Sequence, residues 1–183
     1  MHAVVSLLDD GYAKQVQALW AELYREFGVR GIFGSSYPHF SYQVAASYDV
    51  KRLAEALEPV ANATAPFRIH TGGLGIFPGP RPVLFVPVVR SARLSRLQQA
   101  LWRPMTGVAT DVQGYYQPSF WMPHITIGYG DMDPEMLGRV VTHLSTRSFA
   151  WEIPIDNLAV IYERDGTQGV EFRLAFGGRK RRK

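Results

Sequence analysis

The 183-residue sequence contains no cysteine, which removes several kinds of chemistry at once. Thiol nucleophiles, zinc–thiolate sites and disulfide bonds are excluded, and the composition is compatible with a reducing compartment. The sequence also lacks an apolar run of membrane-spanning length. Its first apolar stretch, residues 1–8, ends at Asp9 and Asp10 and is too short for a signal peptide, so we expect a cytoplasmic protein that does not bind membranes.

Several common nucleotide and hydrolase motifs are missing as well. There is no G-K-[ST] phosphate loop and no G-x-S-x-G nucleophile elbow. The glycine-rich stretch 72–75 cannot open the helix that a dinucleotide fingerprint needs, because Pro78, Gly79 and Pro80 follow it. No histidines and carboxylates cluster with metal-ligand spacing, so we expect neither a metal nor another cofactor.

Positive charge is concentrated at the end of the chain. The formal charge is +4, from 20 basic and 16 acidic residues, but five of the basic residues lie in 179–183. We expect one domain in residues 1–176 and a disordered basic tail in residues 177–183. Such a tail either strengthens contact with polyanions through counterion release or is only a solvated terminus.

Two short stretches of the chain repeat one pattern. They are Pro38-His39-Phe40-Ser41 and Pro123-His124-Ile125-Thr126. In a β-strand, residues two positions apart share a face, so each histidine and its hydroxyl residue point the same way. The residues of opposite parity are apolar: Phe40, Tyr42 and Val44 in the first copy, and Trp121, Ile125, Ile127 and Tyr129 in the second. We therefore expect a core face on each strand and a polar pair that faces a cleft or solvent.

A histidine and a hydroxyl repeated in this way suit acid–base attack on a phosphodiester. One neutral imidazole takes a proton while one imidazolium returns a proton, so two histidines are the minimum. Hydroxyl groups can hold the non-bridging phosphate oxygens, where negative charge gathers during displacement. The candidate catalytic residues are therefore His39, Ser41, His124 and Thr126, and this chemistry requires no metal.

The paired H-x-[ST] motifs resemble the signature of the 2H phosphoesterase superfamily, particularly its bacterial and archaeal 2',5' RNA ligase-like branch. The likeness extends to the glycine-rich segment 66–78 and the segment 81–86, and it covers roughly residues 4–176. Two positions depart from the usual pattern. Ser41 stands where threonine is more usual, and Gly128 and Tyr129 follow the second motif where a cationic residue often does.

The resemblance implies a metal-independent phosphodiesterase that hydrolyses 2',3'-cyclic phosphate at RNA ends or on nucleotides, with 2',5' RNA ligation as a related activity. It also implies that His124 activates the attacking water or hydroxyl and that His39 protonates the leaving oxygen, although a nearly symmetric site permits the reverse. The expected partners are RNA ends or cyclic nucleotides, and the expected state is a monomer. The alternatives are a non-catalytic RNA- or nucleotide-binding module and a phosphoesterase for another small cyclic phosphate.

Other side chains are candidates for holding the substrate. Tyr115, Tyr116 and Phe33 could stack on a nucleobase, as aromatic residues do in single-stranded RNA recognition. Arg68 is a candidate for contact with phosphate, and Arg81 is its alternative. The remaining histidines, at positions 2, 70 and 143, lack the repeated pattern, and we interpret them as structural or incidental.

The order of the expected elements indicates an α+β fold of two pseudo-symmetric lobes, each an antiparallel sheet backed by helices, around a central cleft. Hairpin signals such as Asp165-Gly166 favour antiparallel pairing over parallel crossovers. We expect the segments 66–77 and 83–90 to pair with one another, and 106–118 to be irregular. The other expected strands are 4–8, 37–46, 120–129, 149–164 and 168–176, and the expected helices, with their caps, are 12–27, 49–63, 91–102 and 133–144.

Overall fold

The computed structural model describes residues 1–34, 36–164 and 166–178. Asp165 of the predicted hairpin turn and the predicted tail beyond Gly178 lie outside the described residues. The helices are α1 (Asp10–Phe27), α2 (Val50–Ala63), α3 (Ala92–Thr106) and α4 (Pro134–Leu144), with short 3-10 helices η1 (Gly31–Gly34), η2 (Gly114–Tyr116) and η3 (Phe176–Gly178). The strands are β1 (His2–Leu7), β2 (His39–Tyr48), β3 (Phe67–His70), β4 (Gly75–Phe77), β5 (Val83–Pro87), β6 (Ala109–Val112), β7 (His124–Tyr129), β8 (Glu152–Ile155), β9 (Asn157–Arg164) and β10 (Thr167–Ala175).

Local signals in the sequence set the helix boundaries. The side chains of Asp49, Ser91 and Asp133 each accept a hydrogen bond from the backbone N–H three residues later, so all three predicted N-caps are confirmed. Gly28 closes α1 in the left-handed conformation (φ 74°), which glycine adopts without a steric penalty. No helix in the described part of the chain is long and apolar enough to cross a membrane.

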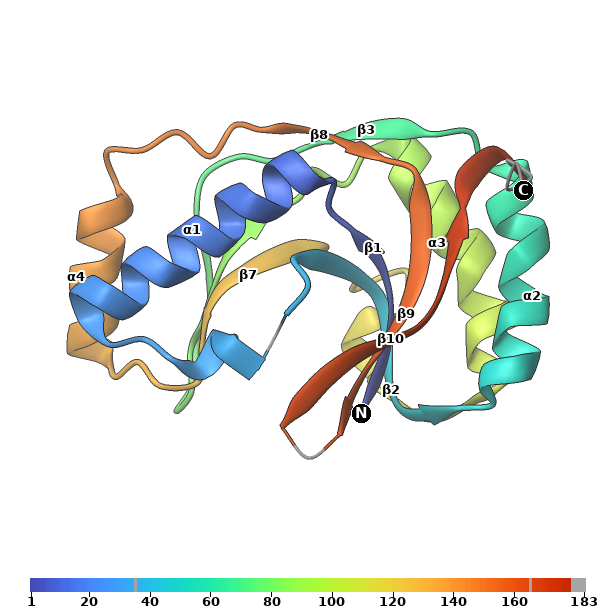
Figure 1. Ribbon diagram of the computed structural model, residues 1–183, viewed down its shortest axis with the longest axis horizontal. Helices are drawn as coiled ribbons and strands as arrows, with labels where there is room; N and C mark the ends of the chain where they lie inside the picture. The colour runs from blue at the N-terminus through green and yellow to red at the C-terminus, as the bar shows by residue number, and fades with distance from the viewer. Residues whose placement is uncertain (35, 165, 179–183) are drawn as a thin grey trace.

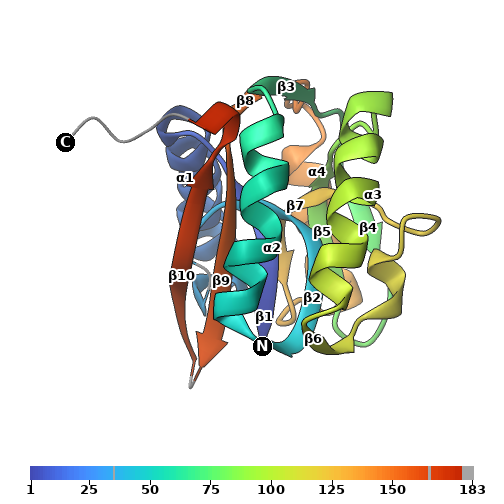
Figure 2. The same cartoon turned by 90° about the vertical axis from the view of Figure 1, so that its right-hand side faces the viewer.

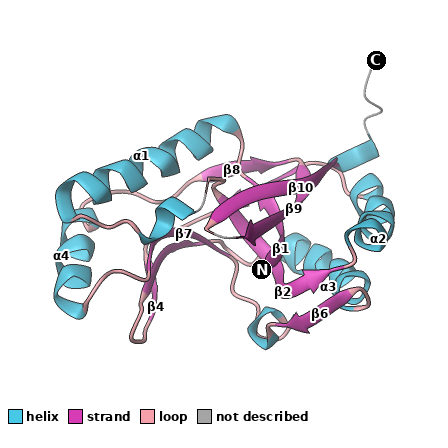
Figure 3. Cartoon of the chain, turned by 60° about the horizontal axis from the view of Figure 1, so that its bottom comes forward, coloured by secondary structure: helices cyan, strands magenta, loops and turns pink. Residues whose placement is uncertain are grey.

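Antiparallel sheets form the two lobes of the molecule. One sheet has the order β10-β9-β1-β2-β6 and the other has the order β4-β5-β7, while β3 and β8 make a separate pair. Helices α2 and α3 pack beside the five-stranded sheet, and α1 and α4 lie at the other end with β7 (Figures 1 and 2). Figure 3 shows the same division by secondary structure. The predicted α+β class with antiparallel pairing is confirmed.

The two lobes contain the same strand-pair unit. β1 pairs with β2 so that Leu7 lies opposite His39, and β5 pairs with β7 so that Pro87 lies opposite His124. Just beyond these pairs, each lobe repeats one backbone hydrogen bond: Leu8 N–H to Pro38 O at 3.0 Å, and Val88 N–H to Pro123 O at 2.9 Å. The repeat seen in the sequence is therefore also a repeat of strand register.

Each motif strand carries a β-bulge directly after its hydroxyl residue. On β2, Ser41 and Gln43 lie opposite consecutive residues of β1, and on β7, Thr126 and Gly128 lie opposite consecutive residues of β5. One residue of each motif strand is therefore extra in its ladder. Bulges re-aim the side chains that follow them, so strict alternation ends at the hydroxyl residue in both lobes.

The structure corrects two expectations about the sheets. Segment 66–77 is not one continuous strand: β4 pairs with β5 as expected and Thr71 forms an antiparallel bridge with Val88, but β3 pairs with β8. The break falls at Gly73, whose φ of 70° is incompatible with a continuous strand. Segment 106–118 is not wholly irregular, since β6 extends the five-stranded sheet beside β2.

Candidate active site

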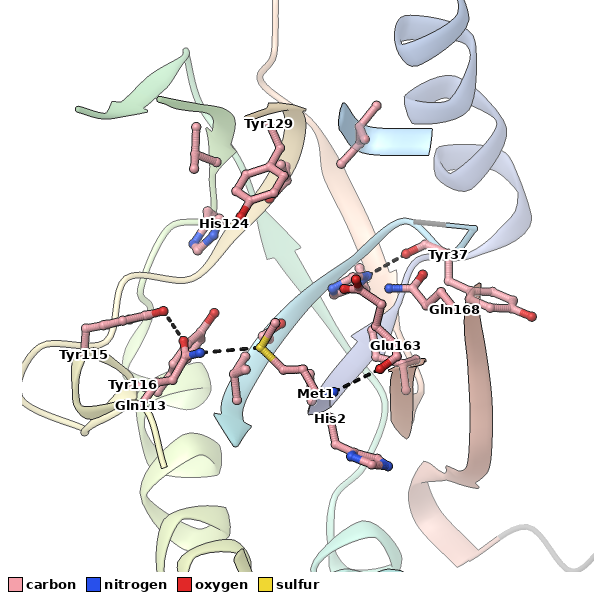
Figure 4. A pocket seen from close by; sticks show the side chains of 18 of the residues that line it. Met1, His2, Tyr37, Gln113, Tyr115, Tyr116, His124, Tyr129, Glu163 and Gln168 are labelled. Carbon is pink, nitrogen blue, oxygen red and sulfur yellow. Dashed lines mark hydrogen bonds between the residues drawn. The ribbon is translucent and has the colours of Figure 1, made fainter. Parts of the chain in front are cut away.

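A cleft of ≈ 630 Å³ brings together the four predicted catalytic side chains. β2 contributes His39 and Ser41, and β7 contributes His124 and Thr126. The opposite faces of these strands are buried in the core, as the positions of Phe40, Tyr42, Ile125 and Ile127 show. In Figure 4 the labelled side chains around the cleft include His124 and Tyr129 on one side and Tyr37, Glu163 and Gln168 on the other.

Both histidine rings are held by the backbone in the same way. Nδ1 of His39 lies 2.5 Å from the carbonyl oxygen of Tyr37, and Nδ1 of His124 lies 2.7 Å from that of Met122. A carbonyl oxygen can only accept, so Nδ1 carries a proton and donates it in each ring. The neutral ring then keeps its lone pair on Nε2. Each Nε2 can accept a proton, and it can donate one when the ring is charged.

Burial is the main influence on the pKa of both imidazoles. It lowers the pKa of His39; the hydrogen bond to Tyr37 opposes this shift, and the charge of His124 adds to it. Burial also lowers the pKa of His124 against the opposing hydrogen bond to Met122. Because the charge of one ring disfavours that of the other, a second proton binds less readily than the first. A pair with one neutral and one protonated ring is what two-histidine acid–base catalysis uses.

The ring of His124 lies against two phenylalanines of the β4–β5 hairpin. The centroid of Phe77 is 4.9 Å from that of His124 in an edge-on arrangement, and the centroid of Phe85 is 5.0 Å away. The position of Phe85 depends on Gly75, because a Cβ at residue 75 would lie 2.3 Å from the Phe85 ring. In this glycine-rich stretch, Gly75 therefore leaves room for the aromatic support of a histidine.

Two buried tryptophans hold the backbone of the hydroxyl residues. The indole N–H of Trp20, from α1, donates to the carbonyl of Thr126 at 3.1 Å. The indole N–H of Trp121 donates to the carbonyl of Ser41 at 2.8 Å, and its ring stacks on Tyr42 at 5.7 Å. These carbonyls lie at the bulges, and Trp121 also ties the second motif segment to the first motif strand. Sequence parity assigned Trp121 to the core but gave no sign of this hydrogen bond.

Tyr129 contradicts the expected core parity of the second motif strand. Its side chain is 49% exposed and lines the cleft, because the bulge after Thr126 reverses the alternation. Val44 has the corresponding position after the bulge in β2, and it also lines the cleft. The sequence could have revealed Tyr129 only if the bulge had been recognised, and a bulge leaves no clear signal in a single strand.

The predicted substrate-binding aromatics lie in different settings. Tyr115 is 63% exposed at the cleft, and its hydroxyl donates to Oε1 of Gln113. Tyr116 also lines the cleft but is buried, and its hydroxyl lies near the side chain of Ser41. Burial raises the pKa of the Tyr116 hydroxyl, so this group stays protonated. The side chain of Phe33 lies outside the described residues.

Arg68 does not reach the cleft, contrary to the expectation that it contacts phosphate there. It lies on β3, where it pairs with Glu152 across the β3–β8 ladder (3.6 Å between Nε and Oε1). The expected pairing of this segment with 83–90 would have placed it nearer the second motif strand. Arg81, the alternative, is exposed in the turn before β5 and is also not among the cleft residues.

Of the other histidines, His70 and His143 lie outside the cleft. His70 is exposed on β3, and His143 of α4 lies 2.7 Å from a carboxylate oxygen of Glu22 on α1. His2 is among the residues that line the cleft, and its Nε2 lies 3.5 Å from Oε1 of Glu171. No group of three or more histidines and carboxylates that could hold a metal occurs within residues 1–34, 36–164 and 166–178.

A family model described as the 2'-5' RNA ligase superfamily matches residues 8–167. The chain belongs to this superfamily. A protein of Bacillus cereus strain B4264, provisionally named a phosphoesterase, is 30% identical over 149 residues, which cover 76% of this chain and 80% of that protein. A protein of Bacillus thuringiensis strain Al Hakam with the same provisional name is 31% identical over 134 residues, covering 70% and 72% of the two chains.

Two solved structures have the same fold at low sequence identity. TT0787 of Thermus thermophilus superposes with a TM-score of 0.68 at 16% identity, over 98% of this chain and 99% of that one. Escherichia coli LigT complexed with 3'-AMP gives a TM-score of 0.60 at 14% identity, over 96% and 97% of the two chains. The resemblance inferred from the two motifs is confirmed, and membership supports a phosphoesterase- or ligase-like function.

Proposed function

We propose that this member of the 2'-5' RNA ligase superfamily is a phosphodiesterase that hydrolyses 2',3'-cyclic phosphate at RNA ends or on nucleotides by metal-independent, two-histidine catalysis. The observation that carries the proposal is the matched setting of His39 and His124. Each ring donates from Nδ1 to the carbonyl two residues before it, and each lines the same cleft together with a hydroxyl residue. The complex of LigT with 3'-AMP agrees with a nucleotide-sized ligand in this fold.

In the proposed reaction, water attacks phosphorus on the side opposite the leaving ribose oxygen. Neutral His124 takes a proton from the water through Nε2 as the new P–O bond forms. Protonated His39 gives its proton to the ribose oxygen as the old P–O bond breaks, which leaves a phosphomonoester and a free hydroxyl. Exchange of protons with solvent then restores both rings. The resemblance supports this assignment, and the reverse assignment balances equally well.

The hydroxyl residues stabilise the charge that gathers on phosphate. Ser41 and Thr126 each donate to a non-bridging oxygen in the proposed reaction, where preorganised donors lower the barrier. Their backbones are held in advance, because Trp121 and Trp20 donate to their carbonyls. Little rearrangement is then needed as the transition state forms.

The negative charge of the substrate offsets the lowered pKa values of the two histidines. Desolvation lowers the pKa of both rings, which favours the neutral base but disfavours the protonated acid. A bound phosphodiester carries one negative charge, and a nearby negative charge raises the pKa of an imidazole. Substrate binding therefore favours the singly protonated pair that the reaction needs.

The experiment that tests this function is phosphomonoester release from 2',3'-cyclic AMP and from a dinucleotide with a 2',3'-cyclic end. We expect release by the wild-type protein and its loss in His39→Ala and His124→Ala. Saturable binding without product would instead identify a binding module. If the protein hydrolysed other small cyclic phosphates but neither of these two substrates, it would be a phosphoesterase with a different substrate. Incubation of the cyclic-ended dinucleotide with an oligonucleotide that carries a free 5'-hydroxyl tests the reverse reaction, 2',5' ligation, at the same site.

A further inference from the structure

We infer that the cleft takes a short substrate, in which one phosphodiester is joined to one or two flat apolar groups, and does not track a longer RNA. A nucleoside 2',3'-cyclic phosphate, with one phosphate and one base, has this chemistry. The inference rests on the proposed function and narrows its substrate. Three features of the cleft support it: its charge, the side chains at its mouth and its size.

The cleft is poor in cationic side chains. Among its described lining residues there is no lysine or arginine, whereas Glu163 contributes a carboxylate. The amino group of Met1 is close by, but it donates to the backbone carbonyl of Glu163 at 2.9 Å. Proteins that track single-stranded nucleic acid do so through a positively charged groove. This lining can neutralise the phosphate between the histidines, but it offers no guanidinium or ammonium side chain to a second phosphate.

Several arginines have structural partners outside the lining of the cleft. The guanidinium of Arg90 donates to the carbonyls of Pro118 and Trp121, and thereby braces the segment before the second motif. That of Arg93 donates to Ala65 O at 2.7 Å. Four other arginines form ion pairs: Arg25 with Glu26, Arg68 with Glu152, Arg147 with Glu22 and Arg173 with Asp156. These contacts hold six arginines in structural roles away from the lining of the cleft.

Exposed apolar side chains gather at the mouth of the cleft. We call this group the apolar rim: Met1, Tyr115, Phe120, Met122 and Tyr129. Among the described residues, the other large apolar side chains that are exposed are Tyr24, Ile76 and Val89. Burial raises the pKa of the Tyr115 hydroxyl, and the phenol of Tyr129, which lies close to it, adds to this rise. Exposed aromatic faces of this kind stack on nucleobases independently of base identity.

The size of the cleft fits the same conclusion. Its volume of ≈ 630 Å³ falls within the range of about 300–1000 Å³ that is typical of small-molecule sites. A mononucleotide would place its cyclic phosphate at the polar histidines and its base on the apolar rim, and so would contact both kinds of surface in the cleft. Additional nucleotides would extend past the apolar rim without meeting cations among the described cleft residues. Chain length should therefore add little to binding in the cleft.

Chain length and salt provide the first test. A variant that ends at Gly178 removes the basic tail, whose charges would otherwise bind longer RNA anywhere on the molecule. We would measure kcat/KM between 50 and 200 mM salt for substrates of one, two and ten nucleotides, all with a 2',3'-cyclic end. Each single-strand phosphate contact contributes a slope of about −0.7 in log K against log salt. We expect a slope no steeper than about one such contact at every length.

The outcomes separate this inference from the function on which it rests. Similar kcat/KM for all three lengths, with a shallow slope throughout, supports a short substrate. A ten-nucleotide substrate preferred by about 10-fold or more, with a slope that steepens with length, would overturn the inference and leave the phosphodiesterase function intact. No phosphomonoester from any length would overturn both.

Rim variants provide a second test with a matched control. Tyr115→Ala and Phe120→Ala should raise KM for the cyclic mononucleotide by about 10-fold, because each removes one stacking face, and should leave kcat nearly unchanged. Tyr24→Ala removes an exposed aromatic ring outside the cleft and should change neither constant. With a substrate that contains the five-membered cyclic phosphate but no base, the rim variants should have the same kcat and KM as the wild type. Equal KM for wild type and both rim variants on the nucleotide would show that the rim does not hold the base.

Discussion

The hydrogen bond from Trp121 to Ser41 gives a sharp test of how the site is positioned. Trp121→Phe keeps an aromatic ring beside Tyr42 but removes the indole N–H that donates to the Ser41 carbonyl at 2.8 Å. Leaving a buried carbonyl without its partner costs about 1–3 kcal/mol. For a chain of this size, each kcal/mol lowers Tm by roughly 2–4 °C. We therefore expect a Tm lower by about 2–12 °C and a protein that is still folded at 25 °C.

The same substitution should lower kcat more than it changes KM. Without the indole bond, the bulge at Ser41 is free to shift, and a displacement of about 1 Å near reacting groups can cost on the order of 100-fold in rate. The assay is steady-state hydrolysis of 2',3'-cyclic AMP, with thermal unfolding followed by circular dichroism. No titrating group is lost, so both limbs of the pH profile should persist.

Trp151→Phe is the matched control for this prediction. Trp151 is similarly buried but packs between Tyr12 and Phe149, and it does not line the cleft. Its replacement should lower Tm and leave kcat unchanged. If Trp121→Phe had a lower Tm but wild-type kcat, as is expected of Trp151→Phe, the positioning role of the indole would be refuted.

Two further predictions concern metal removal and acid stability. Activity should survive EDTA, because the proposed chemistry uses imidazoles; complete loss that a divalent ion restores would show Lewis-acid catalysis instead. The pKa of Glu22 is lowered to about 2, mainly by its hydrogen bond to Arg147 and then by its hydrogen bond to His143. The ionised carboxylate therefore stabilises the fold fully above its unfolded pKa of 4.5, and this stabilisation is lost as the pH falls toward 2. Glu22→Gln should flatten the decline in the free energy of unfolding between pH 5 and pH 2, and an unchanged decline would mean that these contacts contribute nothing to acid stability.

Features that depend on a few neighbouring residues could be predicted from the sequence. The structure confirms the N-caps Asp49, Ser91 and Asp133, each of which depends only on residues within the first turn of its helix. The repeated H-x-[ST] pattern placed His39 and His124 in one cleft, because a repeated segment folds into a repeated strand pair.

Features that depend on distant partners could not be predicted in this way. The pairing of β3 with β8 joins segments about 85 positions apart, and nothing in Phe67–His70 specifies that partner over β5. That pairing takes Arg68 away from the cleft. The bulge that turns Tyr129 toward the cleft is a property of the β5–β7 ladder as a whole. The indole bonds of Trp20 and Trp121 likewise join residues far apart in sequence.

The pH dependence of kcat/KM tests the two-histidine mechanism most directly. This profile reports the free enzyme, in which one ring must be neutral and the other protonated, so it should be bell-shaped. Because burial lowers the pKa of both rings below 6.5, the maximum should lie on the acid side of 6.5. The profile of kcat should lie at higher pH, since bound phosphate raises the same pKa values.

The decisive measurement is this profile for wild type, His39→Ala and His124→Ala on a 2',3'-cyclic nucleotide. Each substitution should lower the rate by about 100-fold or more and remove one limb of the bell from the residual activity. Ser41→Ala and Thr126→Ala should lower the rate while both limbs remain, because these hydroxyls do not titrate in this range. Near-normal turnover by His39→Ala or His124→Ala, with an unchanged bell, would contradict the two-histidine mechanism.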